Sequence, residues 1–176
     1  GVYLNDPSQG LLVKLWRLDA KPNVDTGLVD VVVSAPGGVA VGEASRVLFS
    51  GANIGEVSLA FDQNMNPCVT YMQGSDSKIY WHDPLIPGMT HTTLPAGSRN
   101  PRCTLDDKRA FNVAASDIIV SYIRAGSLYH RRQRDRYATE YLLKSGVGSN
   151  VELVGMAMNT GSRMQFRLRN HALTPD

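Results

Sequence analysis

The chain has 176 residues and a formal net charge of +2, with 43% hydrophobic and 19% charged residues. This composition is typical of a globular domain with a buried core, and it excludes wholesale disorder, collagen and coiled coil. No apolar run approaches the roughly 18 residues that a membrane helix needs, so we expect no membrane insertion.

Strand signals dominate from the N-terminus onward. Residues 11–18 are mostly apolar with partial alternation, and residues 28–33 are rich in β-branched side chains, which favour strands. Turn-forming Pro, Gly and Asn at residues 21–23 and 35–38 separate these runs. We interpret residues 1–55 as β-strands that form either part of the same sheet as the rest of the chain or an arm for oligomerisation.

The middle of the chain repeats itself. Three pairs of segments match: 59–64 with 103–108, 67–72 with 118–123, and 78–83 with 127–132. Each copy is predicted to form four strands, the fourth at residues 89–94 in the first copy and 137–143 in the second. A degraded third copy follows at residues 153–168. Residues 56–170 are therefore expected to form a β-repeat domain, and residues 171–176 a loose C-terminal tail.

A four-stranded unit of roughly 40–50 residues is typical of a propeller blade or a repeated meander. Such a sheet is apolar on both faces, so it is stable only when it stacks on another sheet. Propellers have about four to eight blades, more than this chain supplies. The sequence therefore predicts an all-β fold, either an antiparallel β-sandwich or a propeller-like stack of meanders that several chains complete.

The charges are distributed unevenly. Residues 1–98 carry 5 basic and 9 acidic groups, whereas residues 99–176 carry 13 basic and 7 acidic groups. Two opposite poles suit head-to-tail association of copies, and the basic half suits an acidic partner surface. The small net charge argues against a nucleic-acid reader, which is normally far more basic.

The most distinctive stretch is residues 129–137, which contain four arginines. On a strand, Arg132, Arg134 and Arg136 share one face and Arg131 lies on the other. Such a ladder repels itself, so we expect it to be solvated, paired with acids of the same chain, or placed at a subunit interface. A second basic strand near the C-terminus has the same alternation. The candidate interface with another subunit or partner is Arg131, Arg132, Arg134, Arg136, Arg163, Arg167 and Arg169.

The sequence has no motif that indicates catalysis. Phosphate loops, the nucleophile elbow and zinc-ligand spacings are absent. The segment from Asp62 begins like a calcium loop, but Pro67 and Gln73 stand where Gly and Glu are needed. Cys68 and Cys103 are too few for a disulfide scaffold, so we expect buried free thiols. We expect no enzyme activity, no metal and no cofactor.

Five segments carry a resemblance to a known group of proteins: Phe61–Pro67, Ile79–Asp83, Pro101–Arg109, Ser116–Ile119 and Tyr129–Tyr137. Over residues 57–168 the chain resembles small tail-associated virion proteins of tailed bacteriophages, most of them uncharacterised. The resemblance implies a non-enzymatic structural or adaptor role in the virion tail, after synthesis in the bacterial cytoplasm. It also implies a homo-oligomeric ring of 3, 6 or 12 copies that contacts other tail proteins.

Two other functions stay open at this point. A carbohydrate-binding, lectin-like module would use an exposed Tyr80 or Trp81 with polar neighbours such as Asp76 and His82. A glycan-degrading enzyme, the less favoured alternative, would need two carboxylates on the order of 5–10 Å apart in a cleft. The available carboxylates are Glu56, Asp62, Asp76, Asp83, Asp106 and Asp107.

Overall fold

The computed structural model describes the backbone of residues 2–5, 13–23, 28–34, 40–62, 64, 66–106, 117–159 and 163–171, and the side chains from residue 48 onward within these ranges. The chain divides into two units, Gly1–Ile54 (unit 1) and Gly55–Asp176 (unit 2). Antiparallel strands make up most of the described structure, and η3 (Gln133–Asp135) is a short 3-10 helix. The predicted all-β fold is confirmed.

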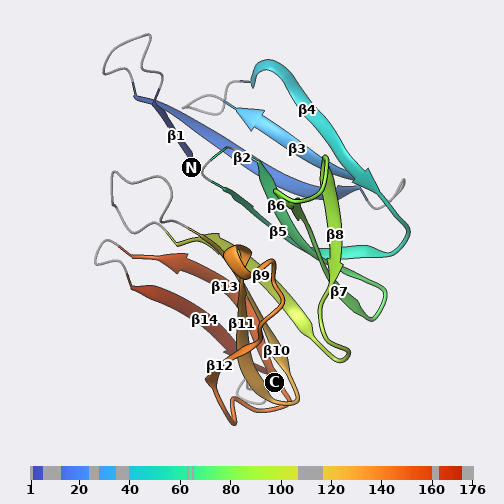
Figure 1. Cartoon of the computed structure of the whole chain (residues 1–176), viewed down its shortest axis with the longest axis vertical. Helices are drawn as coiled ribbons and strands as arrows, with labels where there is room; N and C mark the ends of the chain where they lie inside the picture. Colours follow the sequence, from blue (N-terminus) through green and yellow to red (C-terminus); the bar gives the residue numbers. More distant parts are fainter. Residues whose placement is uncertain are drawn as a thin grey trace. The chain divides into compact units, whose positions relative to one another are not determined.

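Unit 1 is a four-stranded meander (Figure 1). The sequence predicted strands for this region, but it did not predict a meander like those of the repeat. Its strands pair in chain order: β1 (Val2–Asn5), β2 (Val13–Asn23), β3 (Leu28–Ser34) and β4 (Ala40–Ser50). The turn predicted at residues 21–23 is wrong, because β2 continues through Pro22, which pairs with Val29. Among the described strands β1 pairs with β2 only as far as Trp16, so Pro22 lies on a part of β2 that pairs with β3 alone, an edge position of the kind that tolerates proline.

Unit 2 contains the two predicted meanders, each a sheet of four strands in chain order (Figure 1). The first sheet consists of β5 (Ile54–Phe61), β6 (Pro67–Gln73), β7 (Asp76–His82) and β8 (Met89–Thr93). The second consists of β9 (Arg99–Leu105), β10 (Ile118–Arg124), β11 (Ser127–Arg132) and β12 (Tyr141–Lys144).

Both meanders use a two-residue turn between their second and third strands. In the first sheet Gln73 pairs with Asp76 across the turn, and Gly74 has a φ of 60°. In the second sheet Arg124 pairs with Ser127, and both turn residues have positive φ, 48° at Ala125 and 68° at Gly126. Turns of this kind match the twist of a hairpin, which explains the tight repeat of strand lengths.

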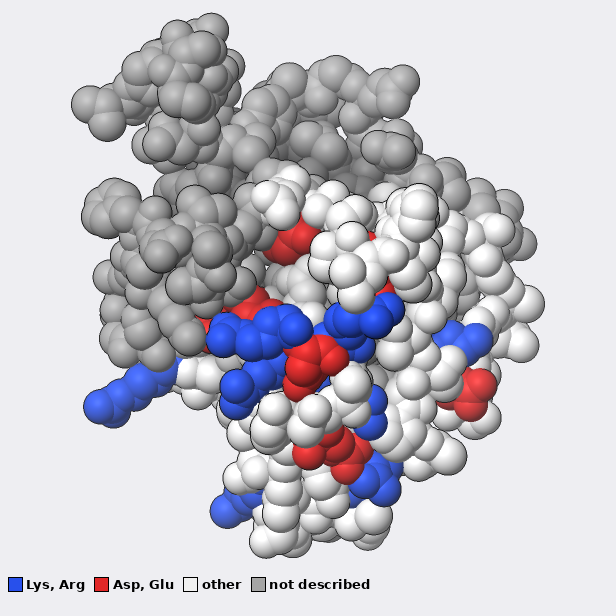
Figure 2. Space-filling view, viewed as in Figure 1, with Lys and Arg blue, Asp and Glu red and all other residues white. Residues whose placement is uncertain are grey.

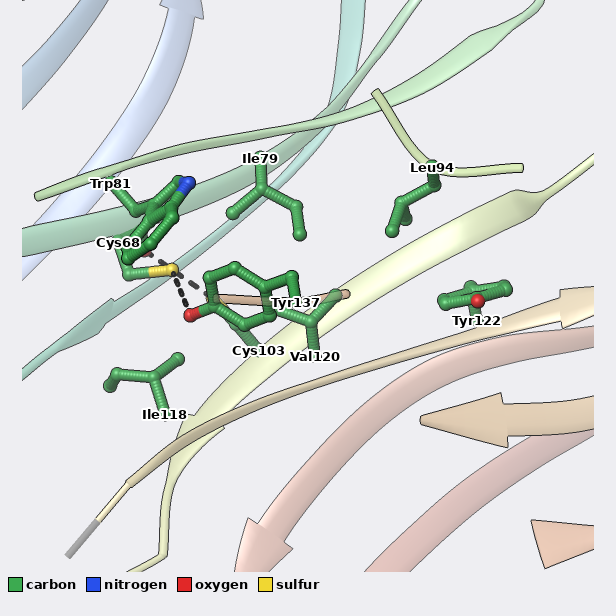
Figure 3. Close-up of a cluster of buried hydrophobic side chains, with 9 residues drawn as sticks. All are labelled: Cys68, Ile79, Trp81, Leu94, Cys103, Ile118, Val120, Tyr122 and Tyr137. Atoms are coloured by element: carbon green, nitrogen blue, oxygen red, sulfur yellow. Dashed lines mark hydrogen bonds between the residues drawn. The ribbon is translucent and has the colours of Figure 1, made fainter. Parts of the chain in front are cut away.

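The core of unit 2 lies between these two sheets, where β6 packs against β9. Figure 3 shows Tyr137 between apolar side chains of the first sheet and those of the second. The cluster consists of Cys68, Ile79, Trp81, Leu94, Cys103, Ile118, Val120, Tyr122 and Tyr137. Both cysteines are buried free thiols, as predicted. Burying a side chain such as Ile79 completely contributes roughly 1.5–3 kcal/mol, so this cluster of nine buried side chains contributes strongly to the stability of unit 2.

The degraded third copy is a hairpin of two strands, β13 (Val151–Met158) and β14 (Met164–Asn170). β13 packs on β9, and Val151 and Leu153 form a second cluster with Ile123 and Leu128. The Arg99 guanidinium holds this layer by donating to the carbonyls of Val151 and Ser149, both at 2.7 Å. Unit 2 is therefore a stack of three layers in which the last is half as wide as the others. Of the predicted tail, residues 172–176 lie outside the described residues.

Candidate interaction site

The predicted arginine ladder over residues 129–137 does not form. β11 ends at Arg132, η3 follows, and Arg136 and Tyr137 have φ values of 57° and 58°. The cause is tertiary: the Tyr137 ring is fully buried, with its centroid 4.9 Å from that of Trp81. Inserting this ring between the sheets turns the chain away from the strand path, so the period-two alternation stops at Arg132.

Three of the four arginines in this stretch have partners within unit 2. Arg134 donates from its backbone N–H and from Nε to Asp117, at 2.9 and 2.6 Å. Arg136 donates to Asp83 Oδ2 from Nε and Nη2, at 2.9 and 2.6 Å. Both aspartates are buried while both guanidinium groups are about half exposed. The hydrogen bond from Arg136 lowers the pKa of Asp83, so this carboxylate is ionised at neutral pH.

Arg131 belongs to a third network. It donates to the Tyr122 hydroxyl at 3.0 Å and to the Tyr137 carbonyl at 2.5 Å, with the Glu140 carboxylate 3.9 Å away. Figure 2 shows the result at the surface: Lys and Arg side chains alternate with Asp and Glu side chains over the described part of this face. These arginines therefore stabilise the meander by charge-assisted hydrogen bonds.

Arg132 is different, because it makes no ion pair with any carboxylate of the described residues. Its guanidinium lies 4.6 Å from the centroid of the Tyr141 ring, and Nε lies 3.4 Å from His130 Nε2. Burial, with the nearby Arg132 charge, lowers the pKa of His130, so the imidazole is neutral at pH 7. The positive charge of Arg132 can therefore form an ion pair with an acidic group of a partner.

Arg132 lines a groove of about 320 Å³ between the second sheet and the hairpin. The β10–β12 side supplies Ile119, His130 and Leu143, and the hairpin side supplies Met158, Met164 and Phe166. The groove exists because β13 and β14 cover only part of the second sheet. The alternation of residues 163–169 indicated the apolar face of β14, but its exposure follows from the width of the layer, in which two strands are described, and the sequence pattern did not reveal that width.

The other basic candidates lie on the opposite face of the hairpin. Arg169 pairs with Glu152 at 3.5 Å, while Arg163 and Arg167 make no ion pair with a described carboxylate. Cross-strand partners confirm the face: Arg167 is opposite Gly155 and Gln165 is opposite Ala157, whereas Phe166 is opposite Met156. The predicted strand with one apolar face and one basic face is therefore present.

The proposed glycan contacts do not form a site. Trp81 is 1% exposed and Tyr80 is 8% exposed, so neither ring is available to stack on a sugar. They point to opposite faces of β7: Trp81 Nε1 donates to Thr92 in the core, and Tyr80 packs on His91. Asp76 is exposed at the first position of β7, and His82 is half-buried at the other end of the strand. The alternation along β7 separates the residues that the lectin interpretation needed together.

The carboxylates at one end of the sheets also have structural partners. A pocket of about 410 Å³ is lined by Asp62 and Asp117, beside the Arg136–Asp83 pair. Asp62 Oδ1 accepts hydrogen bonds from the N–H groups of Asn64 and Asn66, and its Oδ2 accepts from the Gln133 amide. Because both oxygens of Asp62, Asp83 and Asp117 accept hydrogen bonds from the chain, these groups shape turns and ion pairs.

Among the described residues, no group of three or more His, Cys, Asp or Glu side chains is arranged to hold a metal ion. Within the same residues, no helix has the length and apolar character needed to cross a membrane.

Comparison with known proteins found no matching family model, curated protein or solved structure.

Proposed function

We propose that this protein is a non-enzymatic structural component of a bacteriophage tail, a ring, collar or fibre-attachment adaptor. In this role copies associate with one another and dock other virion proteins. The observation that carries the proposal is the narrow last layer of unit 2, in which the described residues form two strands where the other sheets have four. A layer that leaves an apolar groove open suits a protein that functions by association.

The charge distribution supports association between copies. The first 98 residues carry a formal charge of −4 and the remaining 78 carry +6, from the 5 basic and 9 acidic and the 13 basic and 7 acidic groups of the two parts. Arg132, which has no ion-pair partner among the described residues, is the cation of the groove most available to an acidic surface. No observation favours the lectin or the glycan-degrading alternative.

Light scattering of the purified chain at low and moderate salt tests the proposal. We expect a discrete oligomer whose mass falls as salt rises, because salt screens exposed charges. Arg132→Glu should shift the mass toward the monomer, whereas Lys144→Glu, the same charge change at an exposed position outside the groove, should not. A monomer at both salt concentrations would contradict self-assembly.

Immunogold labelling of purified particles tests the tail location, which unlabelled tails would contradict.

A further inference from the structure

The free edge of β14 is an unused binding surface for a strand. β14 pairs with β13 on one side, and no described strand pairs with its other side. A free edge presents backbone N–H and C=O groups in a row, and another extended chain can pair with them. Among the described residues, this layer contains two strands where the neighbouring sheets contain four, so a strand added to this edge would extend the layer over the second sheet.

The groove beside this edge determines which kind of side chain suits one face of the added strand. Met164 and Phe166 of β14 point toward it, and Ile119 and Leu143 lie across from them. Leu143 is 40% exposed, and Leu168 at the end of β14 is 38% exposed. An added strand with apolar side chains on this face would remove these groups from water, which is favourable.

The opposite face determines the charge of the added strand. Arg163, Arg167 and Arg169 share that face of the hairpin, and only Arg169 has an ion-pair partner there, Glu152. Like charges directly opposite one another on adjacent strands are destabilising, and opposite charges are stabilising. Antiparallel pairing of β14 with β14 of a second copy would bring arginines together, so the electrostatics disfavour that arrangement and favour an acidic strand.

No such strand occurs within these 176 residues. Where acidic and apolar side chains alternate, successive acidic residues are two positions apart, and no two of the 16 Asp and Glu residues have that spacing. We therefore propose that β14 binds an extended segment of a different protein, in which acidic and apolar side chains alternate. This inference rests on the proposed docking role, and it names the docking site and the chemistry of its partner.

A peptide pair tests the site directly. The probe is a nine-residue peptide that alternates Glu and Val, blocked at both ends and labelled with fluorescein. The control has the same composition, with its Glu residues grouped so that no face is uniformly acidic. Fluorescence anisotropy with the full chain should show the alternating peptide binding at least about tenfold more tightly than the control. Hydrogen exchange should show slower amide exchange in residues 164–170 when the alternating peptide is bound.

Charge variants locate the contact. Arg167→Glu, at an exposed position that should not affect folding, is expected to weaken binding of the alternating peptide about tenfold. Lys144→Glu makes the same change outside the groove and should leave affinity within about twofold. Equal affinity for the two peptides, unchanged exchange in β14, or equal effects of the two variants would each overturn the proposal.

The outcomes separate this site from self-assembly. If the chain is monomeric by light scattering but binds the alternating peptide through β14, self-assembly is wrong and the docking site stands. If the chain is oligomeric but β14 does not respond to the peptide, the docking site is wrong and the assembly role stands.

Discussion

Glu140 illustrates how one carboxylate organises several aromatic and basic residues. The Tyr122 hydroxyl donates to Glu140 Oε2 at 2.6 Å, and the Arg124 guanidinium pairs with the other oxygen. Burial alone would raise the pKa of Glu140, but the hydrogen bonds from Arg124 and Tyr122 outweigh it and leave that pKa below its ordinary value. Burial also raises the pKa of Tyr122, so its hydroxyl stays protonated and remains a donor.

The lowered pKa makes the contribution of Glu140 to stability depend on pH. A carboxyl group with a lowered pKa in the folded state stabilises the fold above its unfolded pKa, and this stabilisation is lost as the pH falls through the folded pKa. Glu140→Gln should therefore lower the free energy of unfolding by about 1–2 kcal/mol at pH 7. The difference from the parent chain should shrink below about pH 4.5, the ordinary value for Glu. Urea denaturation at pH 7, 5 and 3 measures this, and a difference that stays constant over this range would contradict the assignment.

At the scale of single elements, the predictable parts of the fold are those with local causes. The strands of the two meanders followed from alternation, and their order followed from the repeat of residues 59–83 at residues 103–132. The predicted arginine ladder is wrong from Arg134 onward because the residues that redirect the chain there lie well away in sequence. They are Asp117 and Asp83, which pair with Arg134 and Arg136, and Trp81, against which Tyr137 packs. Alternation describes which face a side chain takes on a strand, but it does not show that a distant aspartate ends the strand.

The hairpin shows the same limit at the candidate site. Its apolar and basic faces were predicted from residues 163–169, but the groove depends on the layer having two strands, over the part of the chain that the structure describes, beside a sheet of four. The width of a layer leaves no pattern in the residues of one strand. The exposed, basic and apolar edge of β14 could therefore be recognised only after the width of each sheet was known.

The turn between β10 and β11 supports a prediction about one element. Ala125 has a φ of 48°, a left-handed conformation that costs an L-residue roughly 1–2 kcal/mol. Asn adopts this conformation more readily, and Asn-Gly is the preferred sequence for such a turn. Ala125→Asn should therefore raise the free energy of unfolding by about 0.5–1 kcal/mol. Chemical denaturation measures the change. Ala138→Asn, at an exposed position without a positive φ, is the matched control and should not stabilise the protein.

At the scale of the whole molecule, the division into two units makes unit 2 a candidate for independent folding. The two apolar clusters between its layers are built entirely from residues 60–166. The ion pairs Arg134–Asp117 and Arg136–Asp83 and the hydrogen bonds of Arg99 also begin and end within unit 2. A chain of this size can bury enough surface to reach the usual 5–15 kcal/mol of domain stability.

We expect the fragment of residues 55–176 to fold alone and to unfold cooperatively in urea, since its main core lies between its own sheets. Circular dichroism and the dispersion of amide NMR signals measure this. Tyr137→Ala in the same fragment is the control, because removing a buried aromatic ring costs about 3–5 kcal/mol and should abolish or strongly weaken the transition. If the fragment has no cooperative transition while the full chain retains one, the three-layer stack depends on residues 1–54 for its stability. The peptide and charge variants would then have to be interpreted as properties of the full chain only.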